Sequence, residues 1–394
     1  MRLRLAALSA LGLAAGLLLA EGLARLLLPA AAGSVRMNRW PESERGKFCR
    51  YHPSLGWEGL PSVSADHAWA DFRCRVTQNA SGFRGPDIPL ERSPGRRVVV
   101  LGDSFVWGFG AGDGSLFTDR LARRSKGALE VVNLGVSGYG TDQEYLLWRS
   151  RGRLWKPDEV WVFVTPVTDL ADVAASRRYG YEKPRFDFDA KGRYRIVNHP
   201  VPRVPPDERA HEYAGEPPPE PVRRLIARSD LFCALLSAAA RSSVLREALE
   251  RRAWLPRMRP GHAWEPPLYR DPTDPDLVPL WSALSGLLSL LAEDVRRSGA
   301  KLTIAAVPSP VQVAPRLWRR FLDEAPPLPD GARYDKEAPT RILSAIAAGV
   351  GADFVDLAPG LRARGGASLY YPVNLHWTED GHRAVADILS ESLP

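Results

Sequence analysis

The sequence predicts an α/β fold in which helices cover both faces of a five-stranded parallel sheet. Five short apolar runs recur along the chain, each bounded by turn-forming residues, as is typical of buried strands. Segments with helical periodicity separate most of these runs, and parallel strands need such crossover connections. The predicted strands are Arg97–Leu101, Leu129–Asn133, Val160–Val164, Lys301–Val307 and Asp353–Leu357.

The helices expected beside these strands complete a flavodoxin-like three-layer sandwich. In open sheets of this kind, ligands bind beyond the carboxyl ends of the strands. Polar residues that directly follow the predicted strands are therefore the first candidates for a functional site. The predicted helices are residues 115–124, 141–151, 277–297, 339–348 and 379–393.

Two segments fall outside this alternating pattern. Residues 30–95 are expected to form an irregular lead-in to the α/β domain, which spans 96–394. Residues 172–276 interrupt that domain and are rich in Pro, Arg and Tyr, with one helix expected near 222–250. A stretch of this length without core strands is typical of a functional insertion or lid, and a solvated excursion is the alternative.

The N-terminus predicts export. A basic start is followed by an apolar run, Leu5–Leu28, whose only charged residues are Glu21 and Arg25. These two residues are four apart, so they share a helix face and are placed to pair. We expect residues 1–29 to form a transmembrane anchor, with a cleavable signal peptide as the alternative. Either leaves the rest of the chain facing the periplasm or the cell exterior.

Charge and cysteine content narrow the range of partners. The chain of 394 residues carries a formal net charge of +7. This charge would favour binding to anionic lipid or acidic polysaccharide, and the alternative is that it is spread over an ordinary solvated surface. It holds no nucleic-acid-binding motif. In an exported protein, Cys49 and Cys74 are expected to form a disulfide, because they flank one segment. Cys233 lies in an apolar stretch and is expected to be a buried free thiol.

Gly102-Asp103-Ser104 directly follows the first predicted strand. This tripeptide delivers a serine to the carboxyl end of that strand, where α/β sheets build their sites. Ser and Asp at such a position also commonly cap the following helix. The tripeptide alone therefore leaves a nucleophile and a helix cap as alternatives.

Further blocks follow in order and decide between these alternatives. They are Phe105–Gly110, Asn133–Gly140 and His376–His382. Together with Gly102-Asp103-Ser104 they resemble the SGNH/GDSL hydrolase superfamily, most closely its membrane-anchored extracytoplasmic bacterial members, some of which act on exopolysaccharides. Gly82–Pro86 is also similar to that subgroup. The resemblance implies a serine esterase that needs no cofactor and no metal.

The resemblance assigns roles residue by residue. Ser104 is the expected nucleophile and His376 the expected base, because ester hydrolysis by serine needs a group that takes its proton. The backbone amides of Ser104 and Gly138 are the expected donors to the tetrahedral oxyanion. Asp103 and Asp169 are expected to support the site. His382 is the other candidate for the base. It falls inside the last predicted helix, where it is expected to cap that helix or to pack in the protein.

Two family positions are substituted in this chain. The family's third oxyanion donor is an asparagine after the third strand, and Thr168 stands there with a shorter hydroxyl donor. Losing one good donor costs about two to three orders of magnitude in rate. The family's aspartate, two residues before the base, is Asn374 here. An asparagine can still orient the imidazole, but it cannot stabilise the imidazolium as a carboxylate does. In the serine-protease template this change also favours the wrong imidazole tautomer and costs up to about four orders of magnitude. Glu379 and Asp380 are substitute carboxylates, although both also suit a helix cap.

The sequence therefore predicts a serine acyl-ester hydrolase that acts on an acylated small molecule or glycan, for example by removing O-acetyl groups from a cell-surface glycan. Two alternatives stay open. The same site suits an O-acyltransferase, and a glycan-binding or assembly protein on a degenerate fold would need no catalysis. Neither a metal-ligand spacing nor a dinucleotide loop in the expected position is present in the sequence.

Overall fold

The computed structural model of this chain describes residues 2–28, 46–69, 72–189, 191–204, 219–239, 242–252, 254, 265–271, 273–328, 332–372 and 374–392. The chain divides into two compact units. The first comprises Met1–Arg45, Ala68–Arg73 and Ala210–Met258, and the second comprises the rest of the chain. Residues of the expected insertion are thus divided between the two units.

The second unit is built on a five-stranded, all-parallel sheet in the order β13-β12-β7-β5-β6. Numbered along the chain, this is the 2-1-3-4-5 order of flavodoxin-like sheets, so the predicted sheet is confirmed. The strand order reverses between β5 and β7, which is where such folds open a crevice for ligands. The strands are β5 (Arg96–Leu101), β6 (Leu129–Asn133), β7 (Glu159–Val164), β12 (Lys301–Ala306) and β13 (Asp353–Asp356).

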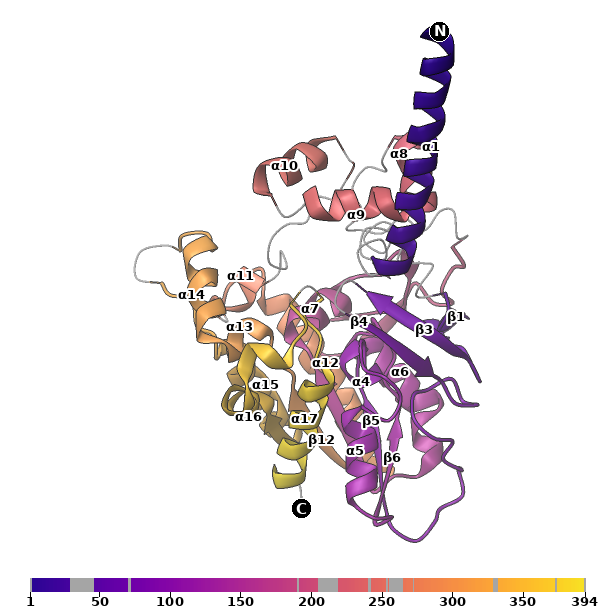
Figure 1. The fold of residues 1–394 in the computed structure, drawn as a ribbon. Helices are drawn as coiled ribbons and strands as arrows, with labels where there is room; N and C mark the ends of the chain where they lie inside the picture. Colours follow the sequence, from indigo (N-terminus) through magenta and orange to yellow (C-terminus); the bar gives the residue numbers. More distant parts are fainter. Residues whose placement is uncertain are drawn as a thin grey trace. The chain divides into compact units, whose positions relative to one another are not determined.

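Two helical layers bury opposite faces of this sheet (Figure 1). Side chains alternate between faces along each strand. Accordingly, Val99 and Leu101 of β5 belong to one core cluster, and Val98 and Val100 belong to the other. The first layer contains α6 (Thr141–Ser150), α7 (Pro166–Ala174), α12 (Val278–Arg297) and α15 (Ala338–Val350). The second contains α5 (Phe117–Arg124), α16 (Leu357–Arg364) and α17 (Glu379–Ser392).

Helix α12 is the longest helix of the core. Among the helices whose side chains the structure describes along their whole length, it is the one long and apolar enough to cross a bilayer. Its apolar side chains, however, include Leu284, Leu288 and Leu291, which are buried in the core against the sheet. The apolar character of α12 is therefore explained by packing within the second unit.

Shorter elements surround the sheet. They are α4 (Ser104–Trp107), η1 (Gly152–Trp155), α11 (Glu265–Leu268), α13 (Pro310–Val313), α14 (Pro315–Glu324) and η3 (Gly366–Leu369). Two hairpins, β8 (Arg177–Arg178) with β9 (Tyr181–Glu182) and β10 (Arg185–Phe188) with β11 (Tyr194–Val197), open the expected insertion.

The lead-in is more regular than the sequence predicted. It contains two antiparallel strand pairs, β1 (Cys49–His52) with β2 (Gly56–Gly59) and β3 (Ser64–Trp69) with β4 (Phe72–Thr77). These strands are only four to six residues long. Strands this short carry too weak a periodic signal to be recognised in the sequence. Each of them pairs with the strand next to it in the chain.

The structure contradicts the predicted Cys49–Cys74 disulfide, because neither cysteine is disulfide-bonded in it. Each packs at the edge of a small apolar cluster around Phe48, Val76 and Trp107. Burial raises the pKa of the Cys74 thiol to about 11, and a protonated thiol is a poor partner for oxidation. Cys233 is a buried thiol, as predicted.

The single helix expected near 222–250 is three helices. They are α8 (Glu220–Arg228), α9 (Asp230–Ala239) and α10 (Ser243–Arg251). Ser229 adopts extended backbone geometry between α8 and α9, and a serine at this position competes for backbone hydrogen bonds and favours a helix start. These helices belong to the first unit together with α1 (Arg2–Leu27).

Candidate active site

Ser104 lies in a tight turn between β5 and α4. The Asp103 carboxylate caps α4 by accepting a hydrogen bond from the Phe105 backbone N–H at 2.8 Å. Gly102 permits the turn, because a Cβ there would lie 2.2 Å from Val106 Cγ2. Ser104 is half-buried, whereas the three residues that follow it are buried. The turn therefore leaves Ser104 as the accessible residue at the start of α4.

His376 reaches Ser104 from the loop before α17. The loop is fixed at its base, since Tyr370 and Trp377 form a β-bridge and Tyr371 N–H donates to the His376 carbonyl at 2.8 Å. The imidazole Nε2 lies 2.7 Å from Ser104 Oγ. This is hydrogen-bond distance for a nucleophile and its base, so the expected Ser–His contact is present.

Asn374 holds the imidazole in the orientation that a base needs. Nδ1 of His376 lies 3.1 Å from the Asn374 carbonyl and 3.2 Å from its side-chain Oδ1. Oδ1 also accepts the His376 backbone N–H at 2.9 Å, which fixes the carboxamide with its oxygen toward the ring. Because both neighbours of Nδ1 are acceptors, the proton belongs on Nδ1 and Nε2 is free to accept. The tautomer problem expected for asparagine therefore does not arise.

Two phenylalanines also position the imidazole. The ring of Phe109 stacks on His376 with centroids 4.5 Å apart, and the ring of Phe105 lies 4.8 Å away. Phe109 in turn receives the edge of the buried His67 ring at 4.6 Å. This packing restricts the orientation of the imidazole ring. Both phenylalanines belong to the sequence block after Ser104, but the sequence alone gave no reason to assign them this role.

Two backbone amides are available to an oxyanion. Gly138 is buried in the loop after β6 with a φ of 78°, which glycine adopts without strain. Among the described residues, neither the Gly138 N–H nor the Ser104 N–H donates to a protein acceptor. A buried N–H is almost always paired, so the unpaired Gly138 amide is a candidate ligand donor. Trp57 holds this loop by donating to the Ser137 carbonyl at 3.1 Å.

The Thr168 hydroxyl, the expected third donor, is directed toward acceptors within the protein in this structure. Its hydroxyl lies 3.2 Å from the Thr165 carbonyl and 3.4 Å from Asp103 Oδ2, and it donates to these acceptors. The cause is local, because Thr168 lies in the first turn of α7, where a threonine hydroxyl reaches the carbonyl three residues back. Its hydrogen is therefore directed into the protein.

Asp103 and Asp169 are buried and hold the segments that carry the site. Asp169 accepts from the backbone N–H groups of Thr141 and Thr165, at 3.1 and 2.6 Å, and so joins the start of α6 to the loop after β7. Asp103 is 3 % exposed. Burial raises the pKa of its carboxyl to about 7 despite the hydrogen bond from Phe105.

More buried acids adjoin this pair, and the sequence analysis missed them. Burial raises the pKa of Asp172 to about 6, and burial together with the neighbouring carboxylates raises the pKa of Glu144 well above its usual range. Two basic residues from the expected insertion compensate part of the charge. Lys183 pairs with Asp142, and Arg178 pairs with Asp172. The first hairpin of the insertion is thus held by buried ion pairs.

The rival candidates have other contacts. His382 is buried, its Nδ1 accepts the Phe117 N–H at 3.4 Å, and burial lowers its pKa to about 3. Glu379 accepts the Gly112 N–H at 3.3 Å, and Asp380 pairs with Arg383. No cluster of His, Cys, Asp and Glu suited to a metal ion occurs among the described residues.

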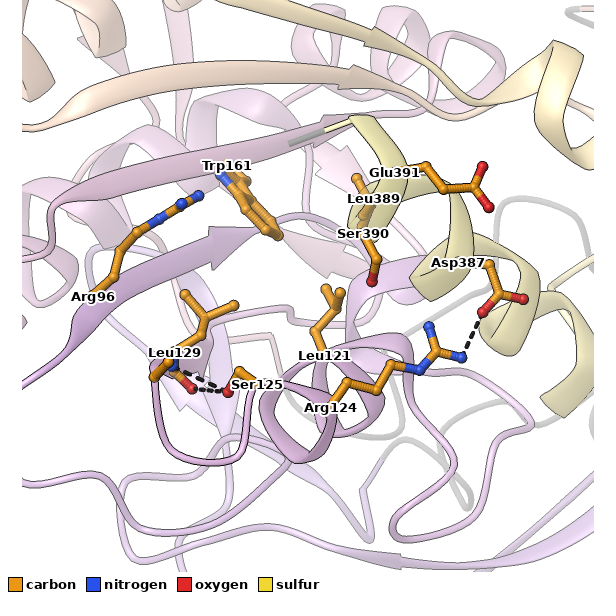
Figure 2. Close-up of a pocket in the computed structure, with 11 residues that line it drawn as sticks. Arg96, Leu121, Arg124, Ser125, Leu129, Trp161, Asp387, Leu389, Ser390 and Glu391 are labelled. Atoms are coloured by element: carbon orange, nitrogen blue, oxygen red, sulfur yellow. Dashed lines mark hydrogen bonds and ion pairs between the residues drawn. The ribbon is translucent and has the colours of Figure 1, made fainter. Parts of the chain in front are cut away.

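A cavity of about 510 Å³ lies at the opposite end of the sheet (Figure 2). Its lining includes Arg96 and Leu129, which begin β5 and β6, and Arg124 at the end of α5. Arg124 is paired with Asp387 across the opening. Because Ser104 follows the other end of β5, this cavity is separate from the Ser–His site.

Comparison with protein-family models finds no match, and comparison with curated proteins finds none either. Solved structures with partial similarity include TesA (14 % identity, TM-score 0.38, covering 76 % of this chain and 98 % of that one). A lipase/acylhydrolase from Enterococcus faecalis is similar at 11 % identity with a TM-score of 0.38, and the match covers 76 % of this chain and 95 % of that one. A catalytic mutant of the acetylxylan esterase Axe2 from Geobacillus stearothermophilus is similar at 12 % identity with a TM-score of 0.36, and the match again covers 76 % of this chain and 95 % of that one. Similarity at this level assigns no activity to the chain, which has to be inferred from the site itself.

Proposed function

We propose that this chain is a serine esterase of the SGNH type. The observation that carries the proposal is the 2.7 Å contact between Ser104 Oγ and His376 Nε2, with Nδ1 of the same ring facing two acceptors. This arrangement activates a hydroxyl, because the ring can take the Oγ proton on Nε2 while keeping its own proton on Nδ1.

The chemistry follows from these groups. Ser104 Oγ attacks the ester carbonyl as His376 takes its proton, and the amides of Ser104 and Gly138 donate to the oxyanion. Collapse of the tetrahedral intermediate transfers the proton from His376 to the departing alcohol and leaves an acyl-Ser104 ester. Water then attacks that ester, with His376 again accepting a proton, and the carboxylic acid leaves with Ser104 restored.

For the substrate we propose a short acyl ester, such as an O-acetyl group, on a glycan outside the cytoplasm. The export signal in the sequence and the resemblance to exopolysaccharide-modifying proteins support this choice. The half-exposed position of Ser104 also suits an ester presented on a large molecule. Hydrolysis is preferred to acyl transfer as the simpler reaction of this site, and the test separates the two by measuring free acetate.

The test combines active-site labelling with turnover. A fluorophosphonate probe followed by peptide mass spectrometry should label Ser104, and the protein should release acetate from p-nitrophenyl acetate and from an acetylated glycan. Ser104→Ala and His376→Ala should abolish both readouts. Ser390→Ala is the matched serine control, because Ser390 lies on α17 beside the distant cavity. An unlabelled Ser104 together with no hydrolysis would reject the esterase in favour of a binding protein.

A further inference from the structure

The two charged residues that interrupt the apolar N-terminal helix both form hydrogen bonds within the first unit. The Glu21 carboxylate accepts hydrogen bonds from Ser229 Oγ at 2.7 Å, from the Asp230 N–H at 2.9 Å and from the Leu231 N–H at 3.2 Å. The last two are first-turn amides of α9, which have no partner inside their own helix. Glu21 of α1 therefore acts as the N-terminal cap of α9.

Arg25 completes the same junction from the next turn of α1. It pairs with Glu21 at 2.8 Å and donates to the Arg228 carbonyl of α8 at 3.0 Å. That carbonyl belongs to the last turn of α8, whose end also lacks helical partners. The charged side chains of α1 thus hydrogen-bond to backbone groups at the ends of α8 and α9 that have no partner within their own helices.

Apolar side chains on three helices of this unit are exposed. On α1, Leu11, Leu18 and Leu26 are 73 %, 75 % and 75 % exposed, and Val244 on α10 is 73 % exposed. Leu235 on α9 is also largely exposed. Exposed leucines recur along α1, and soluble proteins rarely expose large apolar patches.

We propose that α1, α8, α9 and α10 form one lipid-embedded module, in which α1 crosses a phospholipid bilayer and the other three lie in its outer interface. The apolar run begins at Leu5, so Glu21 lies about 24 Å further along the helix. A hydrocarbon core is about 30 Å thick, which puts the Glu21–Arg25 junction near the far interface. Figure 1 shows α9 running across α1 rather than alongside it, as an interfacial helix would.

The polar side of the module fits the same occupant. Arg228, Arg251 and Arg252 are exposed and suit anionic headgroups at the interface. The junction also requires that α1 be retained. Signal-peptide cleavage near Ala30–Ala32 would remove Glu21 from the mature chain and leave the α9 amides uncapped. An uncleaved anchor is therefore part of the proposal.

The test uses the full chain in nanodiscs of phosphatidylethanolamine and phosphatidylglycerol, with its native cysteines replaced. A fluorophore on Leu235→Cys or Val244→Cys should be quenched by lipids that carry a doxyl group in the upper acyl chain. The same fluorophore on Ser390→Cys, in the second unit, is the reference for no lipid contact. Intact mass should show a chain that still contains Glu21. Equal quenching at all three positions, or a mature chain lacking Glu21, would overturn the proposal.

A second pair of variants tests the junction itself. Glu21→Gln should lower the quenching at position 235 severalfold, because the neutral amide caps α9 poorly. Leu18→Ala is the matched control on an exposed face of the same helix and should leave the quenching unchanged. Equal quenching in all backgrounds would show that Glu21 does not dock α9. None of these readouts depends on ester hydrolysis, so they fail or succeed independently of the proposed esterase.

Discussion

Replacing Asn374 with aspartate tests how the base is supported in this site. The substitution is isosteric, and an aspartate oxygen can keep both observed contacts of Oδ1, with the His376 backbone N–H and with Nδ1. It places a negative charge beside the ring and replaces the side-chain NH2 donor with an oxygen that only accepts. We therefore expect Asn374→Asp to raise esterase turnover, since a carboxylate stabilises the imidazolium that forms in the transition state.

The structure limits the size of this gain. The large penalty of asparagine in the serine-protease template comes from the wrong tautomer, and here Asn374 already selects the productive one. What remains is the difference between a neutral hydrogen bond, about 1 kcal/mol, and a charge-assisted one, about 2–3 kcal/mol. A gain of about 1–2 kcal/mol corresponds to roughly 5- to 30-fold in kcat/KM.

The assay is the pH profile of kcat/KM for p-nitrophenyl acetate, measured for the wild type and for Asn374→Asp. A carboxylate favours the charged ring, so it raises the pKa of His376, and the acidic limb of the profile should move to higher pH. Ser104→Ala in both backgrounds sets the blank. A gain of a thousandfold or more would refute the tautomer argument. No gain and no shift of the limb would show that Asn374 does not act on the base.

Three further predictions concern the surroundings of the site. Burial lowers the pKa of His67 to about 3, so only the unfolded chain binds this proton below pH 6.5 and wild-type stability falls as the solution is acidified. His67→Phe should therefore shrink the loss in unfolding free energy between pH 8 and pH 5 by about 2 kcal/mol in urea titrations, and an unchanged loss would contradict it. Lys183→Met should destabilise the fold by about 3–5 kcal/mol by leaving Asp142 buried and unpaired. Adding Asp142→Leu should recover part of the lost stability, and equal stability of the single and double variants would count against a stabilising Lys183–Asp142 ion pair. Phe109→Leu should lower kcat/KM about tenfold with little change in Tm, because His376 loses its stacked neighbour. An unaltered kcat/KM would show that the ring does not position the base.

The sheet was predictable because its signals are local. Each core strand is a short apolar run that ends in turn residues, and the helical segments between the strands indicate right-handed crossovers between parallel strands. The helix boundaries of α12 and α17 also fell within a residue or two of the expectation. The short strands of the lead-in were missed, since four apolar or polar positions carry too little periodicity to mark a strand.

The site was only partly predictable, for a different reason. Ser104, Gly138 and His376 are recognisable in short motifs, but the direction of a side chain depends on neighbours that the motifs do not contain. The Thr168 hydroxyl turns toward the Thr165 carbonyl and the Asp103 carboxylate, and no spacing in the sequence reveals that choice. The stacking of Phe109 on the imidazole likewise depends on two segments 267 residues apart in the chain.

The two positions at which the chain departs from the family that its motifs resemble therefore differ in their consequences. At position 374 the asparagine oxygen is fixed toward Nδ1, so it orients the ring as a carboxylate oxygen would. At position 168 nothing in the described surroundings replaces the lost amide donor, since the threonine hydroxyl is directed inward. The proposed oxyanion site then consists of two backbone amides, from Ser104 and Gly138. A slower acylation step with an intact nucleophile is the kinetic behaviour that such a site implies, and it is why covalent labelling of Ser104 is a sharper test of the proposed activity than turnover alone.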